Sequence, residues 1–263
     1  MDIEFACNID KGLRDYNDDR ALILNQILYS GSYTFTSSTP CMAVVCDGCG
    51  GYEGGGFAAQ LVLDTLSSTG INNLSTPDKL EQALTLANNI VLEKQQEIPQ
   101  YSTMCTTIAG CIFCDDQTII FHAGDSRVYR FDGNSLARMT IDHSAVQAMV
   151  DAGVISQEEA LLHKDRNIIT RCIGANSYPP DIYVSHPSID FGETYLICSD
   201  GLWEVVGDIR IKEILLSGIS LVAMANTLLS SAIELGSEDN ITVCLCRAKS
   251  DRVHMEEEPF ILD

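Results

Sequence analysis

The chain has 263 residues, of which 46% are hydrophobic and 20% charged, which is typical of one large globular domain with a substantial core. Its formal net charge of −21 disfavours nucleic acid and anionic membranes as partners, because both bind positively charged surfaces. The sequence contains no apolar run long enough to span a membrane, and its first residues lack the pattern of a signal peptide. Eleven cysteines, mostly within apolar runs, predict buried free thiols in a reducing cytoplasm.

The first half of the chain is predicted to alternate strands, loops and two helices. Strands are expected at residues 3–9, 21–28 and 42–46, and helices at residues 54–66 and 77–91. Residues 11–19 read as a polar loop, whereas residues 30–40, rich in serine and threonine, predict a hairpin loop. The apolar run that ends at Cys46 places Asp47 at the end of a buried strand, where glycines let the chain turn sharply.

The second half adds further strands and three helices. Strands are expected at residues 106–113, 118–123, 128–131, 195–198 and 241–246, and helices begin after residues 144, 156 and 220. The last residues, 251–263, are expected to form a disordered acidic tail. Strands in both halves, with long amphipathic helices from distant parts of the chain, predict the α+β class, with sheet packed on sheet and helices outside.

Acidic side chains recur at strand ends or beside tight turns. They are Asp19, Asp47, Asp125, Asp200 and Asp239. One such acid usually caps a helix or closes a turn. If all of these ends converge, however, the carboxylates repel one another, and burying them unpaired is costly. Divalent cations relieve that repulsion, and oxygen ligands without a histidine or cysteine set favour magnesium or manganese over zinc.

Acids of this kind predict a phosphoryl-transfer chemistry. Two divalent cations about 4 Å apart activate a water for attack on a phosphoryl group. Arg14, five residues before Asp19, can hold phosphate oxygens with its planar guanidinium group. Metal-assisted phosphoester hydrolysis is therefore the first interpretation. Nucleotidyl transfer and a metal-dependent nuclease use similar acids, but the chain has no Walker loop and few basic residues.

Seven short motifs occur in order along residues 5–247. They are Gly12-Leu13-Arg14 through Asn17-Asp18-Asp19; Val45 through Gly51; Ala123 through Arg127; Thr140 through Asp142-His143-Ser144; Ile169-Thr170-Arg171 with Ile173-Gly174; Cys198 through Trp203; and Asp239 through Val243. Together they resemble the metal-dependent protein serine/threonine phosphatases of type 2C, in their compact bacterial-like form. The resemblance implies a four-layer α-β-β-α sandwich, with two antiparallel sheets flanked by helices, as a single catalytic domain over residues 1–250.

The resemblance also assigns the metal centre. By similarity, Asp47 bridges two tightly bound Mn²⁺ or Mg²⁺ ions and the Gly48 carbonyl binds one of them. Asp200 and Asp239 complete the shell of one metal, Asp19 acts on the other side, and Asp125 resembles a ligand of a third, weaker site. Asp18 and Asn240 are expected to support these ligands from behind.

Two further elements follow from the same resemblance. Arg14 is expected to hold the substrate phosphate. Residues 144–167 correspond to a mobile flap near the site, and we use that name for this segment. His163 within the flap is a candidate for substrate contact, although a surface histidine without a role fits the sequence equally.

The function implied is hydrolysis of phosphoserine and phosphothreonine on proteins, through attack by a water that bridges two divalent metals. The expected partners are phosphorylated proteins and a serine/threonine kinase. The protein is expected to be a monomer. The alternative is a catalytically silent pseudophosphatase that acts as a phosphoprotein-binding module. Pseudoenzymes usually lose an acid, and the complete acid set favours the enzyme.

The sequence departs from the resemblance in three places. Cys49 and Tyr52 stand where many relatives have methionine and histidine, and Cys105 stands where glycine is common. Because Cys49 is predicted to lie beside the metal centre, one hypothesis is that its oxidation lowers activity. A packed thiol without a regulatory role is the alternative.

Overall fold

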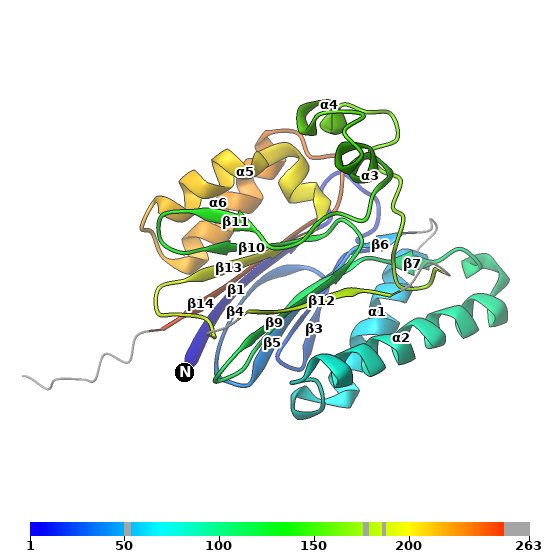
Figure 1. Ribbon diagram of the computed structural model, residues 1–263, viewed down its shortest axis with the longest axis horizontal. Helices are drawn as coiled ribbons and strands as arrows, with labels where there is room; N and C mark the ends of the chain where they lie inside the picture. Colours follow the sequence, from blue (N-terminus) through cyan, green and yellow to red (C-terminus); the bar gives the residue numbers. More distant parts are fainter. Residues whose placement is uncertain (50–53, 176–178, 186–187, 250–263) are drawn as a thin grey trace, which may run out of the picture.

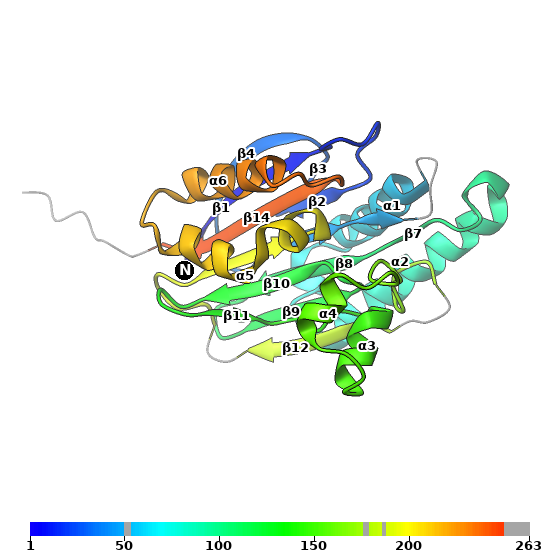
Figure 2. The same ribbon diagram turned by 90° about the horizontal axis from the view of Figure 1, so that it is seen from above.

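The computed structural model describes residues 1–49, 54–175, 179–185 and 188–249. These residues form two six-stranded sheets that pack face to face, and helices cover the outer face of each sheet (Figure 1). Seen from above, the helical pairs lie on opposite sides of the two sheets (Figure 2). The predicted four-layer α-β-β-α sandwich is confirmed.

The first sheet is built around the two ends of the chain. Its strands follow the order β11-β10-β13-β14-β1-β4. Their bounds are β1 Asp2–Asp10, β4 Gly31–Ser38, β10 Arg127–Phe131, β11 Leu136–Arg138, β13 Thr194–Cys198 and β14 Ile241–Ala248. The first strand β1 pairs antiparallel with the last strand β14, with Asp10 opposite Ile241. This pairing places the loop after β1 beside the residues that precede β14.

The second sheet has the order β12-β9-β8-β5-β2-β3. Its bounds are β2 Arg20–Ile23, β3 Gln26–Leu28, β5 Cys41–Cys46, β8 Ile108–Phe113, β9 Thr118–Ala123 and β12 Asp181–Ser185. A small two-stranded sheet, β6 Gly48–Cys49 with β7 Cys105–Thr106, extends from its end. The central strands β5, β8 and β9 are buried along their whole length, because helices cover one face and the first sheet covers the other.

Three apolar layers hold the sandwich together. The helices are α1 Gly54–Thr69, α2 Pro77–Glu97, α3 Ala145–Asp151, α4 Gln157–Leu161, α5 Asp200–Leu216 and α6 Leu221–Glu234, with short 3₁₀ turns at Ile71–Asn73 and Pro99–Tyr101. Side chains of α1 and α2 pack on the second sheet, and those of α5 and α6 pack on the first. The middle layer lies between the sheets, where the rings of Phe113 and Tyr195 meet edge to face at 5.5 Å.

The structure corrects the local predictions at two places. Residues 30–40 were expected to form a hairpin loop, but β4 forms there and pairs with β1 along its length. Its exposed and half-buried residues alternate, as on an edge strand, and the serines and threonines hid that alternation. The predicted strand 21–28 is a hairpin of β2 and β3, which turns where Leu24 adopts a φ of 60°.

Helix α5 was missed by the sequence analysis. Asp200 and Gly201 read as the end of a strand, and Gly207 interrupts the helical pattern with a φ of 70°. The starts of three other helices, α3, α4 and α6, were predicted correctly. Their N-cap residues, Ser144, Ser156 and Ser220, each accept a hydrogen bond from a backbone N–H group in the first turn. The flap therefore contains two short helices. The predicted acidic tail, 251–263, lies outside the described residues.

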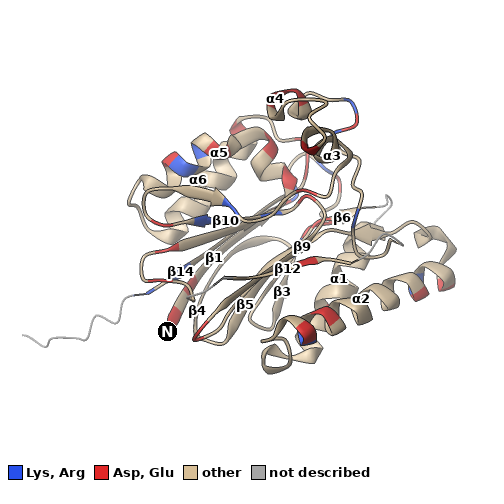
Figure 3. Ribbon diagram, in the orientation of Figure 1, with Lys and Arg blue, Asp and Glu red and all other residues tan. Residues whose placement is uncertain are grey.

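Acidic residues are spread over several elements of the surface. Figure 3 shows them on α2, α5 and the loops at the strand ends, with few basic residues between them. Within the described residues, no helix is both long and apolar enough to cross a membrane.

The packing of α2 on the second sheet makes a prediction about stability. Leu84 is fully buried on α2, whereas Leu86, on the same helix, is 52% exposed. We expect Leu84→Ala to lower the free energy of unfolding by about 2–5 kcal/mol, because it leaves a cavity in the core. Leu86→Ala should lower it by less than about 0.5 kcal/mol. Urea-induced unfolding measures both, and equal losses would contradict the assigned layer.

Candidate active site

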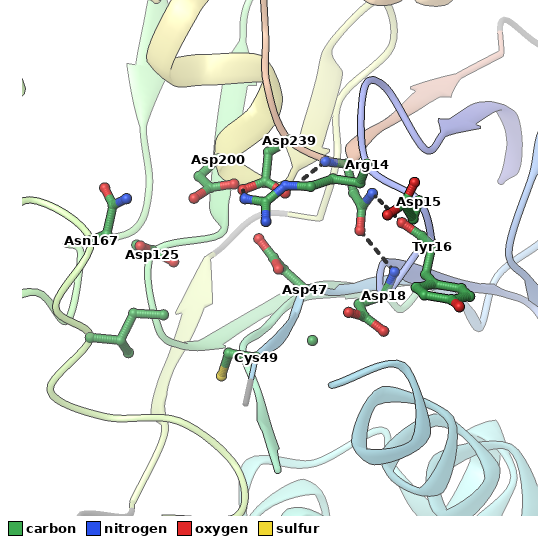
Figure 4. A pocket seen from close by; sticks show the side chains of 13 residues that line it. Arg14, Asp15, Tyr16, Asp18, Asp47, Cys49, Asp125, Asn167, Asp200 and Asp239 are labelled. Atoms are coloured by element: carbon green, nitrogen blue, oxygen red, sulfur yellow. Dashed lines mark hydrogen bonds and ion pairs between the residues drawn. The ribbon is translucent and has the colours of Figure 1, made fainter. Parts of the chain in front are cut away.

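Carboxylates from both sheets converge on a cleft at one end of the sandwich. Asp47 follows β5, Asp125 lies in the turn between β9 and β10, Asp200 begins α5, and Asp239 precedes β14. The cleft has a volume of about 460 Å³. It is lined by Arg14, Asp15, Tyr16, Asp18, Asp47, Gly48, Cys49, Asp125, Asn167, Ile169, Asp200, Asp239 and Asn240. Figure 4 shows the side chains of Arg14, Asp47, Asp200 and Asp239 gathered at its centre.

Glycines allow the cleft walls to come this close. A Cβ atom on Gly201 would lie 2.0 Å from the carbonyl oxygen of Asn240. The backbone of α5 therefore contacts the backbone just before β14 directly, with no room for a side chain between them. A Cβ atom on Gly48 would lie 2.2 Å from the carbonyl carbon of Gly55 in α1. The sequence analysis reached a similar role for the glycines after Asp47, but residues 50–53, including Tyr52, lie outside the described residues.

The backbone of Asp47 is fixed by β7 and the residue that follows it. The Asp47 N–H donates to Thr107 Oγ1 at 3.0 Å, and the Thr107 N–H donates to the Asp47 carbonyl at 2.8 Å. The Thr106 hydroxyl donates to the same carbonyl at 3.0 Å. With its main chain held on both polar groups, Asp47 directs its carboxylate into the cleft without needing a side-chain partner.

Three carboxylates of the site each have one buried oxygen without a donor among the described residues. Asp19 Oδ1, Asp125 Oδ1 and Asp200 Oδ1 are buried and accept no hydrogen bond from any described residue. Burial raises the pKa of Asp19 to about 6 and that of Asp125 to about 7. Burial, followed by repulsion from neighbouring carboxylates, raises the pKa values of Asp47 and Asp200 well above their usual range. Carboxylate oxygens without a protein donor are hard ligands that fit hard divalent cations.

Asp18 and Asp19 occupy different depths. Asp18 lines the cleft, and its Oδ1 accepts the N–H of Gly56 at 2.9 Å at the start of α1. Asp19 is fully buried behind the wall, where its Oδ2 accepts the hydroxyls of Ser199 and Thr242, each at 2.7 Å. The sequence interpretation placed Asp19 at a metal and Asp18 behind it. In the structure, the nearer of the two to the open cleft is Asp18.

Asn240 joins the loop after β1 to the start of β14. Its Nδ2 donates to the carbonyls of Lys11 and Tyr16, both at 2.9 Å, and its Oδ1 accepts the N–H of Asp18 at 2.8 Å. The loop so held carries Arg14, as Figure 4 shows. The supporting role expected for Asn240 at the metal centre stays a prediction.

Arg14 lies at the rim of the cleft and contacts a carboxylate of the site. Its Nη2 is 2.7 Å from Asp239 Oδ2, and its Nε donates to the Glu238 carbonyl at 3.1 Å. More than half of the Arg14 side chain is exposed (57%). The guanidinium group can therefore reach a ligand in the cleft while remaining attached to the edge of the carboxylate cluster.

Asp125 is positioned by a buried ion pair that the sequence analysis did not foresee. The indole N–H of Trp203 donates to the Asp125 carbonyl at 3.0 Å. The Arg127 guanidinium lies 3.3 Å from the centre of the Trp203 ring and forms two hydrogen bonds with Asp142, at 2.9 and 2.6 Å. The motif that contains Asp142 thus acts by fixing the turn that carries Asp125.

The flap reaches the cleft through residues other than the expected one. Among the described residues that line the cleft, Asn167 and Ile169 come from the flap and the residues just after it, and His163 is not among them. The Nδ1 atom of His163 instead accepts the N–H of Asp165 at 3.2 Å. The sequence analysis also missed Asp15 and Tyr16, although both lie inside its first motif.

The prediction of free thiols is wrong for two of the eleven cysteines. Cys49 and Cys105 form a disulfide between β6 and β7, with their Cα atoms 5.1 Å apart. They lie opposite each other in the register of these strands, 56 residues apart in the chain. The apolar runs that predicted buried thiols hold for the remaining nine cysteines, which are buried and free.

Comparisons with known proteins identify the family of this chain. The sequence model of protein phosphatase 2C matches residues 29–206. The serine/threonine phosphatase stp of Listeria welshimeri is 31% identical over 239 residues, covering 88% of this chain and 94% of that protein. The crystal structure of the Mycobacterium tuberculosis serine/threonine phosphatase PstP/Ppp is 29% identical, with a TM-score of 0.81, and the match covers 95% of this chain and 100% of that one.

A further structure shows what such a fold can bind. The catalytic domain of the serine/threonine protein phosphatase PstP, in complex with two manganese ions, matches with a TM-score of 0.78 at 29% identity, covering 95% of this chain and 100% of that one. The chain described here belongs to the protein phosphatase 2C family and is a protein serine/threonine phosphatase.

The raised pKa values predict how cation binding depends on pH. Asp19 and Asp125 keep protons up to about pH 6 and 7, above the usual 3.8, so below these values protons compete with cations. We expect Mn²⁺ to raise the melting temperature more at pH 8 than at pH 6, with an apparent Kd at least about tenfold lower at pH 8. Comparing each pH with and without Mn²⁺ cancels groups outside the site, such as buried His122, whose pKa burial lowers to about 4. Equal shifts at both pH values would contradict the assignment.

Proposed function

We propose that this phosphatase hydrolyses phosphoserine and phosphothreonine on proteins with the help of Mn²⁺ or Mg²⁺. The observation that carries the proposal is the convergence of Asp47, Asp125, Asp200 and Asp239 on one cleft, where Asp125 and Asp200 each have a buried oxygen that no described residue donates to. Asp47, the Gly48 carbonyl, Asp200 and Asp239 would hold two ions, and Asp125 would hold a third, weaker one. Asp19 and Asp18 would act on the opposite side of Asp47.

The bound cations would supply Lewis-acid activation of water and neutralise charge on the phosphoryl group. The protein itself positions the carboxylates that would bind the cations and the guanidinium group that would bind the phosphate. Asp47 offers a carboxylate whose backbone is held by three hydrogen bonds, so that little reorganisation accompanies ligand binding. Arg14 presents a planar fork at the rim, suited to two phosphate oxygens.

The pair of Arg14 with Asp239 links the two halves of the site. A cation bound by Asp239 would draw on the same carboxylate that holds the guanidinium group at 2.7 Å. Arg14 would then exchange that carboxylate for the phosphate of the substrate. Asn240 keeps the Arg14 loop in reach throughout, since it binds the loop at Lys11 and Tyr16.

A silent phosphoprotein-binding module is the weaker candidate. Such a module has no need for the acids, and here every expected acid is present, with Asp47, Asp125, Asp200 and Asp239 on the cleft. We further infer that the substrates are proteins phosphorylated by a partner serine/threonine kinase and that the phosphatase acts as a monomer. The relatives support the substrate class by their names alone.

Charge removal at the centre of the cleft tests the proposal. We expect Asp47→Asn and Asp200→Asn each to lower hydrolysis of a phosphothreonine peptide by at least about a thousandfold, because each removes charge that holds the cations. Asp64→Asn, on the exposed side of α1, is the matched control and should leave the rate unchanged. Steady-state kinetics with saturating Mn²⁺ measures the effect. Activity retained in either cleft variant would exclude the two-metal assignment.

Removal of Arg14 separates substrate binding from metal binding. We expect Arg14→Ala to raise KM more than it lowers kcat, because the side chain mainly holds the substrate phosphate. Arg14→Lys should recover part of the loss, since it restores the charge without the planar fork. Calorimetric titration with Mn²⁺ is the control, because loss of the Asp239 partner should not weaken cation binding. A fall in kcat at unchanged KM would contradict this role.

A further inference from the structure

Three cysteines from distant parts of the chain meet beside the active-site cleft. Cys49 and Cys105 form the disulfide between β6 and β7, and Cys172 follows the flap. All three sulfur atoms lie within 4.8 Å of one another. Cys172 is buried and carries a free thiol. A thiol therefore stands within reach of an existing disulfide.

Cys105 lies on the middle one of three neighbouring segments. On one side, Gly48 and Cys49 pair with Thr106 and Cys105 in antiparallel register. On the other side, Thr106 and Ile173 exchange both backbone hydrogen bonds, at 3.0 and 2.9 Å. This register places Cys172 opposite Thr107, one residue along from Cys105, while Cys49 lies directly opposite Cys105. Cys105 therefore lies on the segment that is bonded to both neighbours, with the sulfurs of Cys49 and Cys172 each within 4.8 Å of its own.

We propose that Cys105 exchanges its disulfide partner between Cys49 and Cys172. In the forward step the Cys172 sulfur attacks the Cys105 sulfur, the Cys105–Cys172 bond forms, and the Cys49–Cys105 bond breaks with its electron pair on Cys49. The proton of Cys172 passes to solvent, and Cys49 takes one up. One disulfide and one thiol exist before and after the step, so it needs neither oxidant nor reductant.

The two pairings restrain different parts of the active site. The Cys49–Cys105 bond ties β6, which carries Gly48, to β7, which also holds the Asp47 backbone. The Cys105–Cys172 bond would instead tie β7 to the segment that follows Asn167 and Ile169 on the cleft wall. Cys49 would then be a free thiol on the cleft wall, and Figure 4 shows its side chain directed away from the carboxylate of Asp47. The exchange moves a covalent restraint from the metal side of the cleft to the flap side.

The exchange itself does not depend on the proposed phosphatase chemistry. Its effect on metal affinity does rest on the assignment of Gly48 as a ligand in the proposed function. Disulfide mapping and Mn²⁺ titration therefore report on the two parts separately, and the phosphothreonine assay reports on the function alone.

Disulfide mapping tests the exchange in wild-type protein and in variants. The protein is treated with limiting dithiothreitol, quenched in acid, alkylated with N-ethylmaleimide, digested and analysed by mass spectrometry. We expect wild type to yield a Cys105–Cys172 peptide besides the Cys49–Cys105 peptide. Cys49→Ser, oxidised with the cyclic disulfide of dithiothreitol, should form Cys105–Cys172, whereas Cys172→Ser should form Cys49–Cys105 alone.

The same mapping can overturn the proposal. Absence of Cys105–Cys172 from both the wild type and Cys49→Ser would exclude the exchange, and the wild-type arm decides if the variant does not fold. Cys114→Ser is the matched control, because Cys114 and Cys172 are both 7% exposed and Cys114 is free. It should leave the mapping of wild type unchanged.

Calorimetric titration with Mn²⁺ tests the consequence for the metal centre. Cys49→Ser locked as Cys105–Cys172 should bind Mn²⁺ three- to tenfold more weakly than Cys172→Ser locked as Cys49–Cys105, because Gly48 has lost its tether. Cys172→Ser should match the wild type. Equal affinities in the two locked forms would overturn the coupling between the exchange and the metal centre.

Discussion

Asp47 and Asp200 are held close enough for repulsion from neighbouring carboxylates to add to the effect of burial on their pKa values. An isolated set of such acids would move apart or take up protons, so its position must be enforced by the rest of the fold. The sandwich does this by fixing main chain rather than side chains. Each acid lies at the end of a regular element or beside one, and Asp19, Asp125 and Asp200 each keep one buried carboxylate oxygen that no described residue donates to. The site is therefore unfavourable until positive charge arrives, which is how a protein keeps affinity for a divalent cation.

The pairing of the first and last strands brings the loop that carries Arg14 to the same end of the sandwich as the carboxylates. Register between β1 and β14 brings Asp10 opposite Ile241, so the loop after one strand meets the residues before the other. Asn240 then closes this junction with hydrogen bonds to three backbone groups. Because these contacts join residues more than 200 positions apart, the groups that we propose to bind substrate and metal share one support. Damage to Asn240 would disturb both.

Sequence reasoning succeeded where local chemistry decides the outcome. The apolar run before Asp47 predicts a buried strand, and an acid at its end is readable without knowledge of the fold. It assigned Asp19 to a metal and Asp18 behind it, but the local pattern could not show that Asp19 is turned inward by the hydroxyls of Ser199 and Thr242, which come from distant parts of the chain. Helix α5 escaped because its glycines serve close approach and a kink rather than helix formation. The disulfide escaped because its two cysteines meet only through the pairing of β6 with β7.

The two disulfide pairings of Cys105 stabilise the fold by nearly the same amount as far as loop-closure entropy is concerned. The Cys49–Cys105 bond closes a loop of 56 residues, and a Cys105–Cys172 bond would close one of 67, since 172 − 105 = 67. In the loop-closure account these lengths differ by only about 0.2 kcal/mol in the stability they confer on the fold. The balance is therefore set by local contacts: by how firmly β6 packs against α1 through Gly48 and Gly55, and how firmly Ile173 is held by Thr106. Ligands that order the metal side or the flap side of the cleft would shift it in opposite directions, because each favours the pairing that restrains its own side.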